Sequence, residues 1–516
     1  MQTPQPSQEL SIKTIAAFMI MVFGMFMAIL DIQIVSSSLA EIQAGLSASS
    51  DEISWVQTSY LIAEVIMIPL SGFLNRALST RVLFTTSAVG FTIASVLCAT
   101  ATSMQQMIIY RALQGFIGGG MIPTVFASAF TIFPPSKRNL VSPIIGLVVT
   151  LAPTIGPTVG GYLSDSFSWH WLFLINLPMG ILVSLGAWYL IDFDKGDKSL
   201  FETMDWVGLI SMAVFLGSLE YVLEEGPQHD WFSDTAVLSL TITMILGGII
   251  FFYRSFTNKN AIVDLYAFAN LNFALGSFFS FVMGIGLYGM TYLYPLYLSS
   301  IQHYSSYMIG NTMFISGLSM FIGAPIAAIL SNKLDPRLLM TIGFLGFAGS
   351  TYQTTYLTSD WAFWQLFLPQ LFRGISMMMC MVPINNIALG TLPAHLMKNA
   401  SGLYNLTRNL GGAIGLGLIN TVLINRSAFH YERIAETMNW GNKAAEGFLQ
   451  TLTMTFNSSG LNGKALALAQ LAGIVRSQAM VMAFVDCFVI LTILFCLLCL
   501  LVWLVKKPEN KASGAH

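Results

Sequence analysis

The sequence predicts an all-α polytopic membrane protein. Of its 516 residues, 55% are hydrophobic and only 9% are charged, whereas soluble domains carry about 25% charged residues. The mean hydropathy of +0.69 points the same way. So little charge cannot cover a water-facing surface of this size, which excludes a disordered chain, a disulfide scaffold and a conventional soluble enzyme. A net charge of −2 gives no electrostatic reason to expect nucleic acid as a partner.

Fourteen segments are candidate membrane spans, because each offers about 20 mostly apolar residues. Lipid cannot satisfy the backbone groups of an open strand edge, so each span is expected to be a helix. The predicted spans are 13–38, 53–74, 81–101, 105–133, 139–163, 170–191, 205–223, 234–254, 269–298, 308–331, 337–357, 362–390, 399–424 and 478–505.

The basic residues predict that both termini lie in the cytoplasm. With this orientation the cytoplasmic segments hold fifteen of the 23 Lys and Arg residues, and the short outer loops carry acids but no Lys or Arg. Membrane proteins retain basic residues on the cytoplasmic side. An even number of spans places both termini on one side, and fourteen is even.

Two polar segments interrupt the spans. Residues 192–204 follow the sixth span and are expected to be a cytoplasmic linker. Residues 425–477, between the last two spans, are expected to be a long outer loop that contains the amphipathic stretches Ala428–Met438 and Ala465–Gln478. This loop is either a solvated segment or a docking surface for a partner in the cell envelope.

Three ionisable residues inside predicted spans are candidates for proton coupling, because charges in a membrane are costly and usually functional. At 1.5 Å per residue, Arg111 lies about 9 Å and Asp31 roughly 11 Å below the outer ends of their spans. The two can therefore pair across the interior of a bundle, while Glu64 lies near the middle of its span. Burial favours the neutral form of a carboxyl and a nearby Arg favours the charged form, as a proton carrier requires. The alternative is a static buried ion pair.

Small residues predict close helix packing at two places. Gly115 follows Arg111 and Gln114, which lie three residues apart on one helical face. In the fifth span, small residues and a proline form a kinked, close-packed face that can act as a hinge or a seal. The residues of this second motif are Gly156, Pro157, Gly160 and Gly161.

Together these motifs resemble the major facilitator superfamily, and in particular its fourteen-span drug:proton antiporter branch, the EmrB/QacA type. The resemblance covers about residues 13–505. Five elements carry it: Leu30-Asp31-Ile-Gln33-Ile34-Val35, Arg111-x-x-Gln114-Gly115, Gly156-Pro157-x-x-Gly160-Gly161, the stretch Trp169–Gly180, and Asn405-Leu-Thr-Arg408-Asn-Leu-Gly411-Gly412.

The chain departs from the family pattern in two places. Gln33 and Ser36 stand where the first-span motif usually has Thr and Asn. In the loop after the second span, Arg76 occupies the usual acidic position and Ser79 the second Gly. The charge lock that this loop usually forms between helices is therefore expected to be altered or absent.

By resemblance, the fold is a six-helix bundle (13–191), two inserted helices (205–254) and a second six-helix bundle (269–505), with a substrate cavity near the midplane. The implied function is proton-coupled efflux of hydrophobic compounds by alternating access in the bacterial inner membrane. An exporter of one native metabolite, lipid or siderophore shares these features. The six histidines form no shared catalytic pattern, and no enzyme activity, cofactor or metal site is expected.

The cavity lining can be predicted only as a set of candidates. They are polar, aromatic or Met residues in spans: Gln33, Gln114, Tyr292, Met378, Asn385 and Arg408. The resemblance also implies a periplasmic adaptor and an outer-membrane channel as partners of residues 425–477. The same segment could instead cap the transporter's own outer mouth.

Overall fold

The computed structural model describes residues 11–36, 38–49, 52–258, 261–438, 443–458 and 463–506. Over these residues the chain is helical and contains no strand. The first six predicted spans correspond to α1 (Ile12–Ser36), α3 (Trp55–Leu78), α4 (Thr80–Ala99), α5 with α6 (Met104–Gly118, Met121–Ile132), α7 (Pro135–Ser166) and α8 with α9 (Trp171–Leu174, Asn176–Leu190). The short α2 (Leu39–Leu46) follows α1.

The remaining predicted spans also fall on helices. These are α10 (Trp206–Glu225), α11 (Thr235–Thr257), α12 (Leu271–Ser300), α13 (Ser306–Lys333), α14 (Pro336–Gln353), α15 (Phe363–Gly390), α16 (Met397–Thr437) and α18 (Gly463–Leu501), with α17 (Lys443–Ser458) between the last two. Short 3₁₀ helices lie in the connections at Lys198–Phe201, Gly226–Gln228, Trp231–Ser233, Leu265–Ala269, Thr354–Tyr356, Ala394–Leu396 and Val502–Leu504.

Twelve helical segments of the described chain are long and apolar enough to cross a membrane. They match twelve of the fourteen predictions. The other two, 337–357 and 399–424, coincide with α14 and α16. The helix α14 has 18 residues, and these include the polar Arg337 and Gln353 near its ends. The helix α16 is polar for a span. Its polar residues Asn405 and Arg408 are buried against other helices and do not face lipid.

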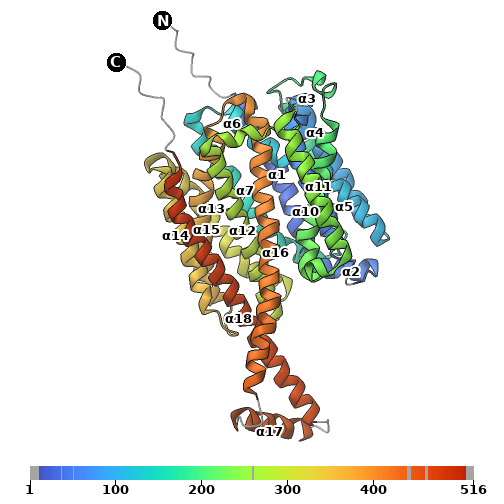
Figure 1. Cartoon of the computed structure of the whole chain (residues 1–516), viewed down its shortest axis with the longest axis vertical. Coiled ribbons are helices and arrows are strands. Elements are labelled where there is room, and N and C mark those ends of the chain that lie inside the picture. Colours follow the sequence, from blue (N-terminus) through green and yellow to red (C-terminus); the bar gives the residue numbers. More distant parts are fainter. Residues whose placement is uncertain are drawn as a thin grey trace.

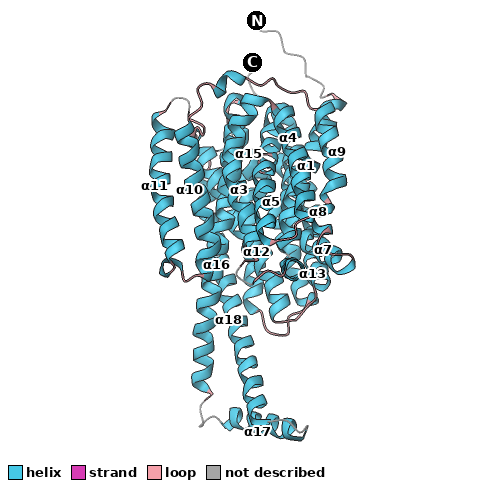
Figure 2. Cartoon of the chain, turned by 90° about the vertical axis from the view of Figure 1, so that its right-hand side faces the viewer, coloured by secondary structure: helices cyan, strands magenta, loops and turns pink. Residues whose placement is uncertain are grey.

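The helices form two bundles that pack against each other. In the first bundle α1 packs on α7 and α9, and α3 on α5; in the second α12 packs on α16, and α15 on α13 and α14. Contacts of α7 with α13 and of α3 with α16 join the two bundles. The pair α10–α11 lies beside them, with α10 against α3 and α16 (Figure 2). The sequence resemblance predicts that these two helices, within about residues 205–254, are an insertion between the bundles.

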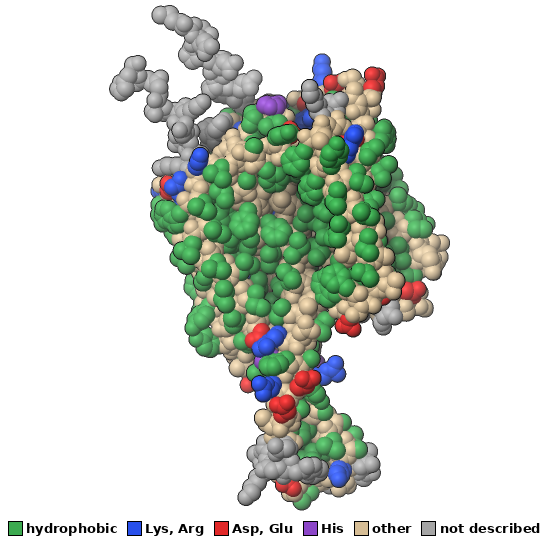
Figure 3. Space-filling view, in the orientation of Figure 1, with side chains coloured by type: hydrophobic (Ala, Val, Ile, Leu, Met, Phe, Trp, Pro, Cys, Tyr) green, Lys and Arg blue, Asp and Glu red, His purple; other side chains and the backbone are tan. Residues whose placement is uncertain are grey.

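The surface has the pattern of a membrane protein. Hydrophobic side chains cover the middle of the face shown in Figure 3, and charged side chains gather toward its two ends. The start of α1 and the end of α18 lie at the same end of the molecule, opposite α17 (Figure 1). This face therefore presents an apolar belt that suits lipid.

Residues 425–477 are helical through nearly all of their described length, so the expectation of a long loop is corrected. The stretch Ala428–Met438 continues α16 to Thr437, and Ala465–Gln478 belongs to α18. No proline interrupts either stretch, and adding a residue to an existing helix needs no new nucleation. We call residues 425–437, 443–458 and 463–477 the helical extension; it projects beyond the bundles, with α17 across its tip (Figures 1 and 2).

A charged cluster joins the two helices where the extension begins. Arg426 Nε donates to Asp486 Oδ2 over 2.5 Å, and the His430 Nε2 atom lies 2.8 Å from the same oxygen. The first two residues belong to α16 and Asp486 to α18. The extension therefore leaves the membrane domain from a fixed base.

Glycines allow the closest helix contacts. A Cβ atom added at Gly115 of α5 would lie 2.3 Å from the Tyr60 carbonyl oxygen of α3. In the second bundle, a Cβ at Gly411 of α16 would lie 2.0 Å from the Phe281 carbonyl oxygen of α12. Backbone atoms cannot move aside as a flexible side chain can, so these positions fix the helix spacing in each bundle.

We expect Gly411→Val to lower the thermal unfolding temperature of the detergent-purified protein by several degrees, since overpacking costs about 1–3 kcal/mol. Gly349→Val in α14 is the matched control, because a Cβ there meets no heavy atom within 4 Å. Equal unfolding temperatures for the two variants would contradict the packing argument.

Candidate functional site

The structure brings Asp31 and Arg111 together in the interior of the first bundle, as the depth calculation predicts. Arg111 Nη1 lies 2.7 Å from Asp31 Oδ2, and both side chains are 0% exposed. Gln114 belongs to the same cluster: its Oε1 accepts from Arg111 Nη1 at 2.6 Å, and its Nε2 donates to Asp31 Oδ1 at 3.1 Å. A buried charge pair is stable only with such additional hydrogen bonds.

Neighbouring helices hold the guanidinium group of Arg111 in place. Its Nε donates to the Val56 carbonyl oxygen of α3 at 3.0 Å. Its Cζ lies 4.3 Å from the centre of the Tyr60 ring and 5.8 Å from that of Phe173. Aromatic faces stabilise a cation that has no contact with water. The close approach of α5 to α3 at Gly115 makes the contact with Val56 possible.

Two members of this cluster were not predicted from the sequence. Asn176 Nδ2 donates to Asp31 Oδ1 at 2.5 Å and to Ser95 Oγ at 3.2 Å, and Gln114 Nε2 donates to the same Ser95 Oγ at 2.7 Å. Asn176 is the first residue of α9, directly after the break between α8 and α9. The available sequence signal for Asn176 was its place within Trp169–Gly180, a stretch that resembles the family. No sequence signal pointed to Ser95, a serine inside a span.

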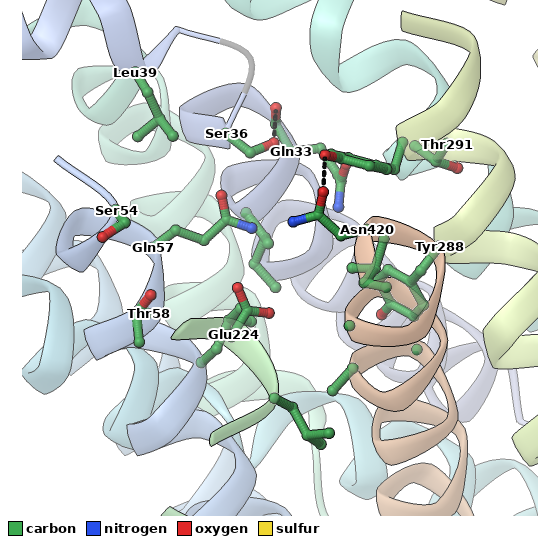
Figure 4. Close-up of a pocket in the computed structure, with 18 of the residues that line it drawn as sticks. Gln33, Ser36, Leu39, Ser54, Gln57, Thr58, Glu224, Tyr288, Thr291 and Asn420 are labelled. Carbon is green, nitrogen blue, oxygen red and sulfur yellow. Dashed lines mark hydrogen bonds between the residues drawn. The ribbon is translucent and has the colours of Figure 1, made fainter. Parts of the chain in front are cut away.

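A cavity of about 550 Å³ lies between the two bundles, in the half of the molecule that is nearer to α17. Its wall comes from α1, α3, α7, α10, α12, α13 and α16 (Figure 4). Of the predicted cavity residues, Gln33 and Tyr292 line it. Tyr292 also donates to Asn420 Oδ1 at 3.3 Å across the α12–α16 contact. The volume of this cavity is within the range of pockets that hold a drug-sized molecule.

The other predicted cavity residues lie elsewhere. Gln114 is fully buried in the Asp31 cluster. Met378 packs where α15 meets α13, near Gly323, and Asn385 Oδ1 accepts from Tyr404 at 2.5 Å. Arg408 contacts Asn405 at 2.6 Å and lies over the ring of Phe126. The sequence indicated that these side chains are inside the protein but not which helix they face.

Glu64 lies in the cavity wall and interacts electrostatically with both members of the ion pair. Its carboxylate lines the cavity, its side chain is only 3% exposed, and it makes no hydrogen bond or ion pair with a described residue. The cations that act on it electrostatically are Arg111 and Arg408, and Asp31 is the nearby anion. A buried carboxylate that meets a cavity without a fixed partner can exchange its proton.

The glycine motif of α7 has a different partner on each side. A Cβ at Gly156 would lie 2.4 Å from Gln33 Cβ of α1, and Pro157 lines the cavity. Next to them, Thr158 lies close to α13: a Cβ atom added at Gly310 would lie 2.3 Å from Thr158 Oγ1. Gly160 and Gly161 are buried further along the helix. The motif therefore contacts the first bundle and the second one at the level of the cavity.

At the opposite end, polar contacts close the interface between the bundles. Lys398 at the start of α16 forms an ion pair with Asp194 of the linker and donates to the Asn75 carbonyl oxygen at 3.2 Å. Asp194 Oδ1 also accepts from the Thr80 amide at 3.0 Å, at the start of α4. Asp194 thus supplies an acidic group next to the loop in which Arg76 replaces the usual acid.

A second contact closes the same end on α7. Arg138 Nη1 donates to the Gly390 carbonyl oxygen of α15 at 3.1 Å, and Ser142 Oγ donates to Asn386 Oδ1 at 2.5 Å. The cavity is therefore closed toward the end where α1 begins. The residues that line the cavity lie on the other side of these contacts, toward the helical extension.

Comparison with known proteins agrees with this geometry. Residues 21–416 match the Major Facilitator Superfamily. The chain is 42% identical over 481 residues to "Colistin resistance protein EmrB" of Acinetobacter baumannii, covering 93% of this chain and 94% of that protein. It is 30% identical to "Multidrug export protein EmrB" of Escherichia coli strain K12, covering 99% and 98%.

Among solved structures, the proton:xylose symporter XylE bound to 6-bromo-6-deoxy-D-glucose has the same fold, with a TM-score of 0.58 and 12% identity over 95% of this chain and 97% of that one. At this low sequence identity, the similarity to the symporter supports only the assignment of the fold. The two sequence relatives match over nearly the whole chain, and the family match covers residues 21–416. This chain belongs to the major facilitator superfamily.

Proposed function

We propose that the protein is a proton-coupled multidrug efflux antiporter of the bacterial inner membrane. The observation that carries this proposal is the interfacial cavity with the unpaired Glu64 in its wall, next to the buried pair of Asp31 and Arg111. Relatives that match over nearly the whole chain are named for multidrug export and for colistin resistance. Their names support export of drug-like compounds.

The orientation is part of the proposal. With both termini in the cytoplasm, the helical extension lies outside and the contacts of Lys398 and Arg138 close the cytoplasmic side. Glu64 then releases a proton when substrate binds from the inside and takes one up when substrate leaves. One proton moving inward across 100 mV supplies about 2.3 kcal/mol. Purified protein in proteoliposomes with an imposed pH gradient and a panel of hydrophobic compounds tests the coupling directly.

We expect Asp31→Asn to abolish transport driven by a pH gradient. This change leaves Arg111 as an unpaired buried charge, which costs about 3–5 kcal/mol and can lower stability as well. The variant that combines Asp31→Asn with Arg111→Gln removes both charges and should regain thermal stability without regaining transport. Transport at the wild-type rate by the double variant would show that the pair is only structural.

We expect Glu64→Gln to weaken the pH dependence of substrate binding. If proton and substrate compete, wild-type affinity rises with pH as the Glu64 carboxyl loses its proton, whereas Gln has no proton to lose. Binding titrations between pH 5 and 9 measure this, and Gln57→Ala is the control because Gln57 lines the cavity without titrating. The role of Glu64 is refuted if the variant keeps the wild-type slope.

We propose further that the helical extension docks a periplasmic adaptor. It carries large apolar side chains that are exposed: Phe429, Phe448, Met454, Leu468 and Ile474. Exposed apolar groups on a water-facing surface mark interaction sites. The alternative is that the extension serves only the transporter's own outer mouth.

Replacing residues 432–477 with a short Gly/Ser linker tests this. The replacement keeps Arg426, His430 and Asp486, so the base of the extension stays joined. We expect transport in proteoliposomes to survive, and whole-cell resistance and adaptor pull-down to be lost. If whole-cell resistance also survives, or if transport by the purified protein collapses, the adaptor role is wrong.

A further inference from the structure

Arg408 of α16 is a buried cation without an acidic partner. Its side chain is 2% exposed, and its Nη2 atom donates to Asn405 Oδ1 at 2.6 Å. The Nε and Nη1 atoms of the same guanidinium group are buried without an acceptor. The Phe126 ring, whose centre lies 5.3 Å from Arg408 Cζ, stabilises the charge only in part. A cation left in this way inside a membrane protein is a candidate for function.

Glu64 of α3 is the carboxyl group that faces this cation. The two side chains act on each other electrostatically, yet no hydrogen bond or ion pair joins them. The other cation near Glu64 is Arg111, which is engaged by Asp31 at 2.7 Å. Arg408 is therefore the cation that is available to Glu64.

Glu64 and Arg408 lie at a similar depth on opposite sides of the interface between the bundles. The helices α3 and α16 approach each other at Gly402, where a Cβ atom would lie 3.1 Å from the Ile68 carbonyl oxygen. From this contact toward the helical extension, Glu64 is about 6 Å along α3 and Arg408 about 9 Å along α16, at 1.5 Å per residue. A difference in depth of about 3 Å is within the reach of an arginine side chain.

Close packing attaches the backbone of each residue to its own bundle. A Cβ atom at Gly119, at the end of α5, would lie 3.0 Å from the Glu64 carbonyl oxygen. A Cβ atom at Gly284 of α12 would lie 2.2 Å from the Arg408 carbonyl oxygen. The Glu64 backbone is thus held in the first bundle and the Arg408 backbone in the second. A force between the two side chains therefore acts between the bundles.

The unpaired arrangement fits a protonated Glu64. A carboxyl group that is buried without a cation or a hydrogen-bond donor is stable in its neutral form, whereas a buried carboxylate needs a counter-charge. Loss of the proton would leave a negative charge close to the unpaired guanidinium of Arg408. Opposite charges attract strongly where the dielectric constant is low, so proton release should draw the two side chains together.

The other ionisable groups around Glu64 do not offer a free positive charge. They are Asp31 of α1, Tyr60 of α3, Arg111 of α5, Glu220 of α10 and Tyr288 of α12. Two of these are acids, and the tyrosines carry no positive charge. The guanidinium of Arg111 is held by Asp31, Gln114 and the Val56 carbonyl oxygen.

We propose that Arg408 is the counter-charge of Glu64: when Glu64 releases its proton, the carboxylate pairs with Arg408 across the interface and draws α3 and α16 together beside the cavity. Uptake of a proton breaks the pair and restores the arrangement of this structure. The inference rests on the proposed proton-coupled function and names the residue through which the proton acts on the bundles.

Two measurements between pH 5 and 9 test the inference on the full-length protein in nanodiscs without substrate. Infrared difference spectroscopy follows the carboxyl C=O band that Glu64→Gln removes. Pulsed electron resonance measures the distance between spin labels at Gln105→Cys of α5 and Ile424→Cys of α16, which are exposed positions in different bundles. The background variant Cys496→Ser removes an exposed cysteine. We expect the parent protein to lose the band and shorten the distance over the same pH range.

Three variants separate the ion pair from a structural role of Arg408. Arg408→Gln should keep the Glu64 band until about one pH unit higher or more, the size of one opposite charge, and should abolish the shortening. Arg408→Lys keeps the charge and should keep the shortening. Arg373→Gln is the matched control, because Arg373 of α15 is also 2% exposed but lies over the ring of Tyr294. This control should leave both measurements unchanged.

The outcomes decide between the ion pair and its alternatives. The inference is wrong if folded Arg408→Gln loses the band at the parent pH or still shortens, or if Arg373→Gln has the same effects. If Arg408→Gln does not fold, Glu64→Gln decides, since a shortening that persists in this variant also overturns the pair. Neither measurement needs substrate or a gradient, so failure of a pH gradient to drive export overturns the efflux proposal separately.

Discussion

The buried ion pair between Asp31 and Arg111 is the constraint on which the first bundle depends. A charge in the interior of a membrane protein must be neutralised and hydrogen-bonded, or it is not tolerated. Here five helices meet that need: α1 and α5 give the pair, α3 gives the Val56 carbonyl, α4 gives Ser95 and α9 gives Asn176. Gly115 and the break before α9 lie directly beside these contacts.

The cavity shows the opposite arrangement. Asp31 has an ion-pair partner, whereas Glu64 and Glu220 line the cavity without a hydrogen bond or ion pair to a described residue. The difference separates a carboxylate fixed in the architecture from carboxylates that are free to respond to protons and ligands. Both kinds lie close together, which gives the protein a physical route by which occupancy of the cavity affects the interior of the first bundle.

The contacts at the two ends of the interface differ in kind. Toward the start of α1, ion pairs and hydrogen bonds from Lys398 and Arg138 hold the bundles together, and water can replace such contacts when they open. Beside the cavity, the α7–α13 contact at Thr158 and Gly310 is a close steric fit. A polar closure at one end and a packed pivot beside the site suit a rocking movement of one bundle against the other.

The fold class and the buried ion pair of this protein could be predicted from the sequence alone. The fold class follows from hydropathy, and the pairing of Asp31 with Arg111 from helical rise and span direction, since depth along a straight helix is simple arithmetic. Which side of a helix faces the cavity cannot be calculated in the same way. Gln114, Asn385 and Arg408 were expected at the cavity but face other helices, because packing partners decide which side of a span meets water.

The same limit applies to the segments that only the tertiary structure explains. Glu220, Glu224 and Glu225 lie at or just beyond the end of the predicted span 205–223. Nothing in the sequence indicated that α3 and α16 would place them in a cavity with α11 behind them. Residues 425–477 were polar enough to suggest a loop, yet two long helices continue through them and are joined at their base by Asp486. Sequence fixes local periodicity and depth; which faces meet is decided by contacts between residues far apart in the chain.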